Sequence, residues 1–136
     1  MRLSKLVFPV IAAVTSSAFV VTPASAAHEP CKVLTAETFS KAMSYAATID
    51  KTASTQMSCF YKGPGNSGGQ FMILTEAAAG PQVDAMLKGP GSAPPPGSGL
   101  VGGTYKEGTV VFSISIKSTD QAKLQALVDE IRRNLK

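Results

Sequence analysis

The residues with the most specific chemistry in this 136-residue chain are its only two cysteines, Cys31 and Cys59. An even number of cysteines favours pairing when a protein is exported to an oxidising compartment. A redox-active pair is the alternative, but neither residue lies in a Cys-x-x-Cys motif or a thioredoxin-like strand–helix pattern. We therefore predict a structural disulfide, which is worth about 3–4 kcal/mol in the chain-entropy model.

The chain has few other residues that could form a metal site or a catalytic triad. His28 is the only histidine, whereas a zinc site needs three or four converging ligands and a Ser-His-acid device needs a positioned base. We interpret His28 as a solvated residue of a polar N-terminal lead. The sequence alone does not decide against a pair of catalytic carboxylates across the sheet. We nevertheless predict no catalytic, cofactor-binding or metal-ligating residue and no cofactor.

Glycine-rich stretches at 63–69 and 97–103 lack the Gly-Lys-Ser/Thr ending with which a phosphate loop reaches its ligand. The run from Gly89 to Gly99 contains only Gly, Pro, Ser and one Ala, so it predicts a loop. Loops of this kind are often either functional or flexible. The residues that we single out as a possible partner-binding loop are Gly89, Pro90, Pro94, Pro95, Pro96 and Gly99.

The N-terminal segment is typical of a secretory signal peptide. Arg2 and Lys5 precede a mostly apolar stretch at 6–21, and Ala24-Ser25-Ala26 is a small-x-small cleavage signal. The alternative is a membrane anchor, but the stretch contains Pro9 and is shorter than the ~20 apolar residues that a span needs. We expect a signal peptide at 1–26, cleavage between Ala26 and Ala27, and a periplasmic or secreted product.

The remaining residues, 27–136, predict a single domain without a further membrane span. The whole chain is 44% hydrophobic and 16% charged, which is ordinary for a globular domain. Its formal net charge of +4 includes the two basic residues of the leader. Because the other basic residues are scattered, the charge pattern argues against nucleic acid as a partner.

Two elements at the C-terminal end predict the architecture. Residues 109–117 alternate apolar and polar side chains, as expected of a strand with one buried face. The helix that follows has an apolar stripe at three- and four-residue steps; Ser118 and Gln121 have capping-box spacing, and Asp120 suits the positive helix end.

Similar patterns elsewhere predict an initial helix capped by Thr35, with an apolar stripe that includes Phe39, Met43, Ala46 and Ala47. They also predict a second helix at 77–88 and strands at 56–62, 70–76 and 100–106. The element order is therefore α-β-β-α-β-β-α. We predict an α+β fold in which one four-stranded antiparallel sheet has its helices on one face.

The opening Cys31-Lys32-Val33-Leu34-Thr35 and the strand Cys59-Phe60-Tyr61 resemble a group of small exported bacterial domains of unknown function. Those domains open with Cys-x-Leu-Leu-Thr before a helix, carry a Cys-x-Tyr strand, end on an amphipathic helix and are often lipoproteins. Here Val33 replaces the first leucine, and the glycine that often follows the first helix is missing near 47–49. The resemblance implies the disulfide and the helix–hairpin fold, and it carries no activity and no catalytic residues.

The sequence thus favours a small, exported, non-enzymatic binding or interaction domain. Its partner would be a protein, a component of the cell envelope or a small ligand, and an inhibitor of an exported hydrolase is one version of this function. The alternatives are a small periplasmic enzyme, either a hydrolase or a redox protein, and a purely structural envelope component.

Overall fold

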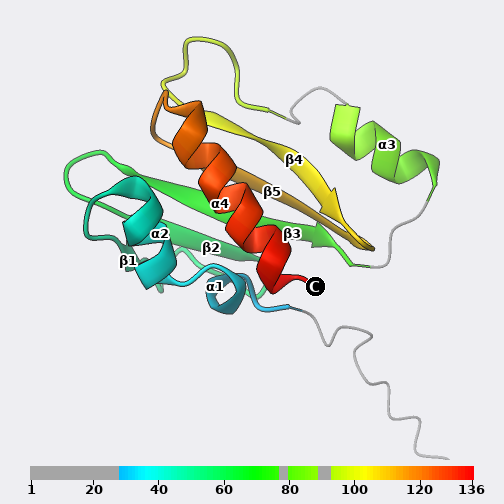
Figure 1. Ribbon diagram of the computed structural model, residues 1–136, viewed down its shortest axis with the longest axis horizontal. Coiled ribbons are helices and arrows are strands. Elements are labelled where there is room, and N and C mark those ends of the chain that lie inside the picture. Colours follow the sequence, from blue (N-terminus) through cyan, green and yellow to red (C-terminus); the bar gives the residue numbers. More distant parts are fainter. Residues whose placement is uncertain (1–27, 77–79, 89–92) are drawn as a thin grey trace, which may run out of the picture.

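The computed structural model describes residues 28–76, 80–88 and 93–136, which form one sheet with helices packed against it (Figure 1). The sheet contains five strands in the order β1-β2-β3-β5-β4, and all neighbouring strands are antiparallel. The predicted signal peptide, 1–26, and its cleavage site at Ala26 and Ala27 lie outside the described residues. In chain order the elements are α1 (Pro30–Val33), α2 (Ala36–Met43), β1 (Thr48–Ile49), β2 (Ser58–Lys62), β3 (Gly68–Thr75), α3 (Pro81–Lys88), β4 (Val101–Glu107), β5 (Val110–Ile116) and α4 (Gln121–Asn134).

The α+β class is confirmed, but the predicted number of four strands is wrong because the sheet also contains the two-residue strand β1. The helix that was expected to reach Ala47 ends at Met43, since Ser44 takes a left-handed conformation with φ 62°. Ala47 then donates its backbone N–H to Ser40 Oγ at 2.8 Å, and the chain turns into β1. A strand of two residues is too short to produce an alternating pattern in the sequence.

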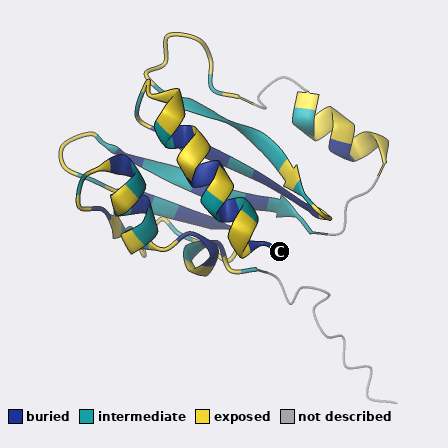
Figure 2. Cartoon of the chain, in the orientation of Figure 1, coloured by how far each residue is buried: buried dark blue, intermediate teal, exposed yellow. Residues whose placement is uncertain are grey.

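Helices α1, α2 and α4 lie on one side of the sheet, whereas α3 lies beside β4 (Figure 1). Alternate side chains of the central strands point toward these three helices and are buried, as are the inner stripes of α2 and α4 (Figure 2). The buried strand residues on this helix-covered face are Cys59, Tyr61, Phe71, Ile73, Val110, Phe112, Ile114 and Ile116. The core therefore occupies the space between one face of the sheet and the three helices.

Tyr61 connects the sheet to the start of α2. Its ring stacks on Phe39 with centroids 4.3 Å apart, and its hydroxyl donates a hydrogen bond to the backbone oxygen of Leu34. Burial of this phenol raises the pKa of Tyr61 above its ordinary value. The predicted N-cap of the helix is confirmed, because Thr35 Oγ1 accepts a hydrogen bond from the Thr38 N–H at 3.3 Å.

Helix α4 confirms the predicted stripe: Leu124, Leu127, Val128 and Ile131 are buried. Its N-cap is Asp120, whose carboxylate accepts from the N–H of Ala122 at 2.9 Å and of Lys123 at 3.4 Å. The capping box expected from Ser118 and Gln121 is therefore wrong. Instead, Ser118 Oγ accepts from the Asp120 N–H and supports the residue that caps the helix.

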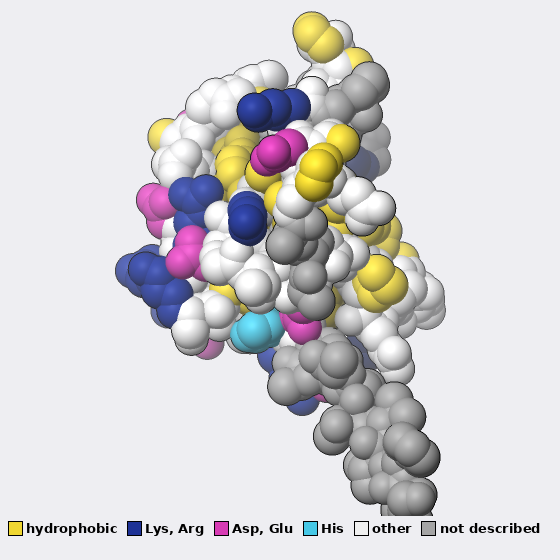
Figure 3. Space-filling view, turned by 90° about the vertical axis from the view of Figure 1, so that its right-hand side faces the viewer, with side chains coloured by type: hydrophobic (Ala, Val, Ile, Leu, Met, Phe, Trp, Pro, Cys, Tyr) yellow, Lys and Arg dark blue, Asp and Glu magenta, His cyan; other side chains and the backbone are white. Residues whose placement is uncertain are grey.

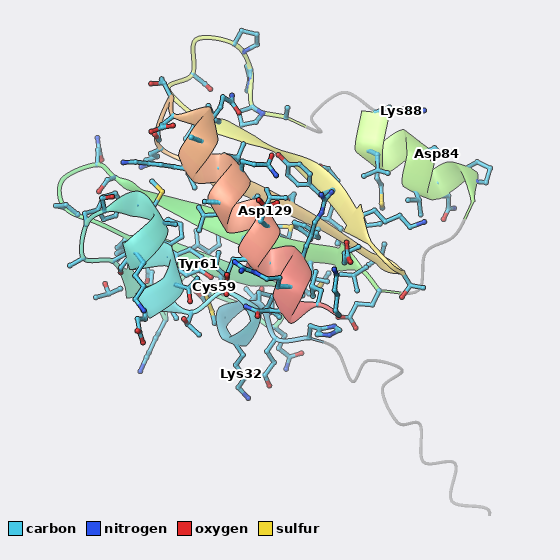
Figure 4. The ribbon with its side chains drawn as sticks, viewed as in Figure 1. Lys32, Cys59, Tyr61, Asp84, Lys88 and Asp129 are labelled. Carbon is cyan, nitrogen blue, oxygen red and sulfur yellow. A yellow bond between two sulfur atoms is a disulfide. The ribbon has the colours of Figure 1, made fainter. Side chains whose placement is uncertain are left out.

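The predicted disulfide between Cys31 and Cys59 is present, with Cα atoms 5.2 Å apart. It joins α1 to β2 on the helix-covered side of the sheet, where Figure 4 labels Cys59. Because both cysteines are bonded, neither thiol is available as a nucleophile or a metal ligand in this state of the protein.

Candidate functional site

The candidate site lies on the side of the sheet opposite α1, α2 and α4, which we call the open face. Strand register aligns its side chains in rows across the sheet, since side chains alternate between the two faces along each strand. One row runs from Phe60 through Gln70 and Ser115 to Gly102, and the next runs from Ser58 through Met72 and Ser113 to Thr104. Ser58 is buried, whereas the other seven residues are partly exposed, so most of the centre of this face is accessible to solvent.

The two sides of the molecule differ in chemistry. Seen from the right-hand side of Figure 1, charged side chains gather on the side of the helices, whereas the opposite side is mostly hydrophobic or uncharged (Figure 3). The open-face rows agree with this view, because they consist mainly of hydroxyls, an amide, a methionine and a phenyl ring. Such a surface offers hydrogen bonds and apolar contact at little desolvation cost.

Two adjacent hollows on the open face together make up what we call the sheet groove. The first, of about 340 Å³, includes Asp50, Phe60, Gln70 and Lys117 in its lining, and the second, of about 300 Å³, is lined by the loop before β4 and by residues of β4 and β5. Both hollows contain Leu100 and Ser115 in their linings, so they are neighbours at these residues. Each is at the lower end of the size range of small-molecule sites.

Two glycines on the open face allow neighbouring strands to approach closely. A Cβ atom on Gly102 would lie 2.3 Å from the backbone oxygen of Ile114, which leaves no room for a side chain. Gly68 has a φ of +134°, and a Cβ there would lie 2.1 Å from the backbone oxygen of Tyr61. Of these two positions, Gly68 lies in the lining of the first hollow and presents no side chain there.

A single carboxylate, that of Asp50, contributes to the linings of the two hollows. It accepts hydrogen bonds from Lys62 Nζ at 2.8 Å, from the Thr52 hydroxyl at 2.7 Å, and from the N–H groups of Thr52 and Ala53. The Lys62 ammonium, followed by the Thr52 hydroxyl, holds the pKa of Asp50 well below its usual range. Asp50 is therefore ionised at neutral pH, which does not suit it to act as a general acid.

The predicted Pro–Gly loop contributes only partly to the groove. Pro94 and Pro95 line the second hollow, whereas Pro96 and Gly99 are exposed and line neither hollow. The other two residues of the prediction, Gly89 and Pro90, lie outside the described residues. Within the described part, the Ser98 N–H donates to the Pro95 oxygen at 3.2 Å, so this segment forms a turn beside β4.

The sequence pattern does not reveal the central residues of the groove, Phe60, Gln70 and Ser115. Their polar or mixed character is what an ordinary solvent-facing strand surface shows, so composition contains no signal for them. A weak signal lay in the glycines of β4, since glycine inside a strand often marks a close backbone approach. The rows become recognisable only when the register across β2, β3 and β5 is known.

The side chain of His28 is 37% exposed, in partial agreement with the predicted solvated position, but it is held to the sheet. Both its backbone N–H, at 2.8 Å, and its ring Nδ1, at 2.9 Å, contact Glu76 Oε1 at the end of β3. Such a pair could orient an imidazole, but no hydrogen bond among the described residues brings a hydroxyl or thiol to this ring. The described residues also contain no group of three or more His, Cys, Asp or Glu side chains placed to hold a metal ion.

Comparisons of the chain with protein-family models, with curated proteins and with solved structures found no match in any of the three. Among the described residues, no helix is long and apolar enough to cross a membrane.

Proposed function

We propose that this protein is a non-enzymatic binding domain and that the sheet groove is its binding site. The observation that supports the proposal most strongly is the open face itself, where rows of mostly partly exposed side chains border two adjacent hollows. Gly68, in the lining of the first hollow, leaves space there that a side chain would otherwise occupy. The prolines at the rim add a rigid wall on one side.

A native mass spectrum of the protein from its producing cells tests this function, because it detects a ligand or subunit that stays bound. We expect a companion mass on the wild-type protein that is lost on Ser115→Trp, since an indole would fill the middle of the groove. The matched control is Ala122→Trp on the exposed start of α4, which should retain the companion. Both variants should keep the wild-type melting temperature. A companion that persists on Ser115→Trp, or its absence from the wild type, would count against the groove.

We further propose that the protein is exported to the periplasm or beyond, with removal of residues 1–26. The disulfide supports this proposal, since such bonds persist in oxidising compartments. A denaturing mass spectrum of the exported fraction should give the mass of residues 27–136 less the two hydrogens lost on forming one disulfide. A mass that includes the leader, or that corresponds to two free thiols, would contradict this expectation.

A further inference from the structure

One end of the sheet groove has an excess of positive charge. Lys62 and Lys117 are the cationic residues that line the first hollow, and Asp50 is its only carboxylate. Lys62 already pairs with Asp50, whereas the exposed Lys117 forms no ion pair with any described residue. Because Lys62 balances the charge of Asp50, the positive charge of Lys117 has no matching carboxylate in the lining of this hollow.

The two lysines stand on either side of a position without a side chain. Lys62 is the register partner of Gly68, and the Lys117 N–H donates to the Gly68 oxygen at 2.9 Å. Neighbouring strands are about 4.8 Å apart, so the two lysine backbones are about 10 Å apart across Gly68. Two flexible ammonium groups can converge from this separation on one carboxylate above the glycine.

The rest of the groove is uncharged and suits the main chain and side chains of a peptide. Gln70 and Ser115 offer an amide and a hydroxyl along the floor, beyond the lysines. Phe60, Leu100 and Pro94 provide apolar walls against which side chains of a ligand can pack. The chemistry therefore changes along the groove from cationic to neutral and partly apolar.

We propose that the sheet groove binds an extended acidic peptide segment, with a carboxylate between Lys62 and Lys117 and uncharged residues along Gln70 and Ser115. This inference rests on the proposed binding function and specifies the partner of the same site. A peptide fits better than a second copy of the domain packed by its own open face, because a symmetric contact of that kind brings lysine-bearing surfaces together. The occupant is then a segment of another protein that presents an acidic residue ahead of neutral ones.

The test uses an acetylated seven-residue peptide in which two glutamates are followed by alanine and serine residues. The matched peptide has glutamine in place of each glutamate. Titration of the disulfide-bonded protein is followed by amide NMR shifts. We expect shifts that centre on Gly68, Gln70, Ser115 and Lys117, and a dissociation constant about tenfold lower for the glutamate peptide, as for one charge-assisted contact. Binding should weaken as salt is raised, because this end of the groove is exposed.

The matched variants are Lys117→Gln, expected to weaken glutamate-peptide binding about tenfold, and Lys88→Gln on α3, expected to change nothing. Both lysines are exposed, and Figure 4 shows Lys88 on the separate helix beside β4. Equal binding of the two peptides, or an unchanged affinity in Lys117→Gln, would overturn the inference. So would binding of a uronic-acid oligosaccharide in the groove in place of the acidic peptide. If the acidic peptide fails while a native companion is still lost on Ser115→Trp, the peptide inference falls and the proposed binding function stands.

Discussion

Removal of the disulfide by Cys31→Ala with Cys59→Ala is expected to lower the free energy of unfolding by about 3 kcal/mol. The bond spans a sequence separation of 28 residues, so its loss frees a long loop in the unfolded chain. It also leaves a gap in the native core, because Cys59 is completely buried. A domain of this size has a total stability of about 5–15 kcal/mol, so the double variant should lose a large fraction of it.

Urea unfolding followed by circular dichroism measures this effect, and the wild-type protein with its disulfide reduced should unfold between the oxidised wild type and the double variant, because it loses the cross-link but keeps the buried Cys59 sulfur. The matched control is Lys32→Ala, next to Cys31 in α1. Its exposed ion pair with Glu29 should contribute little, and Figure 4 shows Lys32 pointing away from the sheet. An unchanged midpoint in the double variant would mean that α1 is held to β2 by packing alone.

The parts of the fold that the sequence predicted are those with a sustained period. Strand β5 buries every second residue from Val110 to Ile116, apart from the additional burial of Val111, and α4 buries a stripe at helical spacing. Both patterns arise because one face of each element packs against the same core, so the amino-acid types report the geometry directly. The disulfide was predictable for a different reason, since an even number of cysteines favours pairing in the oxidising compartment that the N-terminal segment predicts.

The candidate site could not be predicted in this way, because it depends on pairings between segments far apart in the chain. Lys62 and Lys117 are brought together only by their common neighbour Gly68. His28 reaches Glu76 across 48 residues, and neither residue has a sequence pattern that specifies the other. The predicted loop was only partly informative: Pro94 and Pro95 reach the groove because of how the chain enters β4, which composition does not specify.

The side chain whose truncation should be most costly is Phe39, and we expect Phe39→Ala to lower the free energy of unfolding by about 3–5 kcal/mol. Phe39 is completely buried between α2 and the sheet. Its ring stacks on Tyr61 at 4.3 Å and meets the edge of Tyr45 at 6.4 Å, so its loss removes two aromatic contacts along with apolar burial. Gly69 of β3 lies directly beneath it, since a Cβ on that glycine would be 3.1 Å from Phe39 Cζ.

Comparison with Lys41→Ala on the exposed side of α2 separates loss of packing from loss of the helix, because this control should leave the unfolding midpoint nearly unchanged.

Gly69→Ala tests the same packing from the side of the sheet. Its new methyl group would meet Phe39 and also the backbone oxygen of Ser115, at 2.7 Å. Removing the Phe39 ring relieves only the first of these contacts, so Gly69→Ala should remain destabilising in the Phe39→Ala background. A double variant as stable as Phe39→Ala alone would show that the strand backbones of β3 and β5 adjust freely, contrary to the close approach described for this part of the sheet.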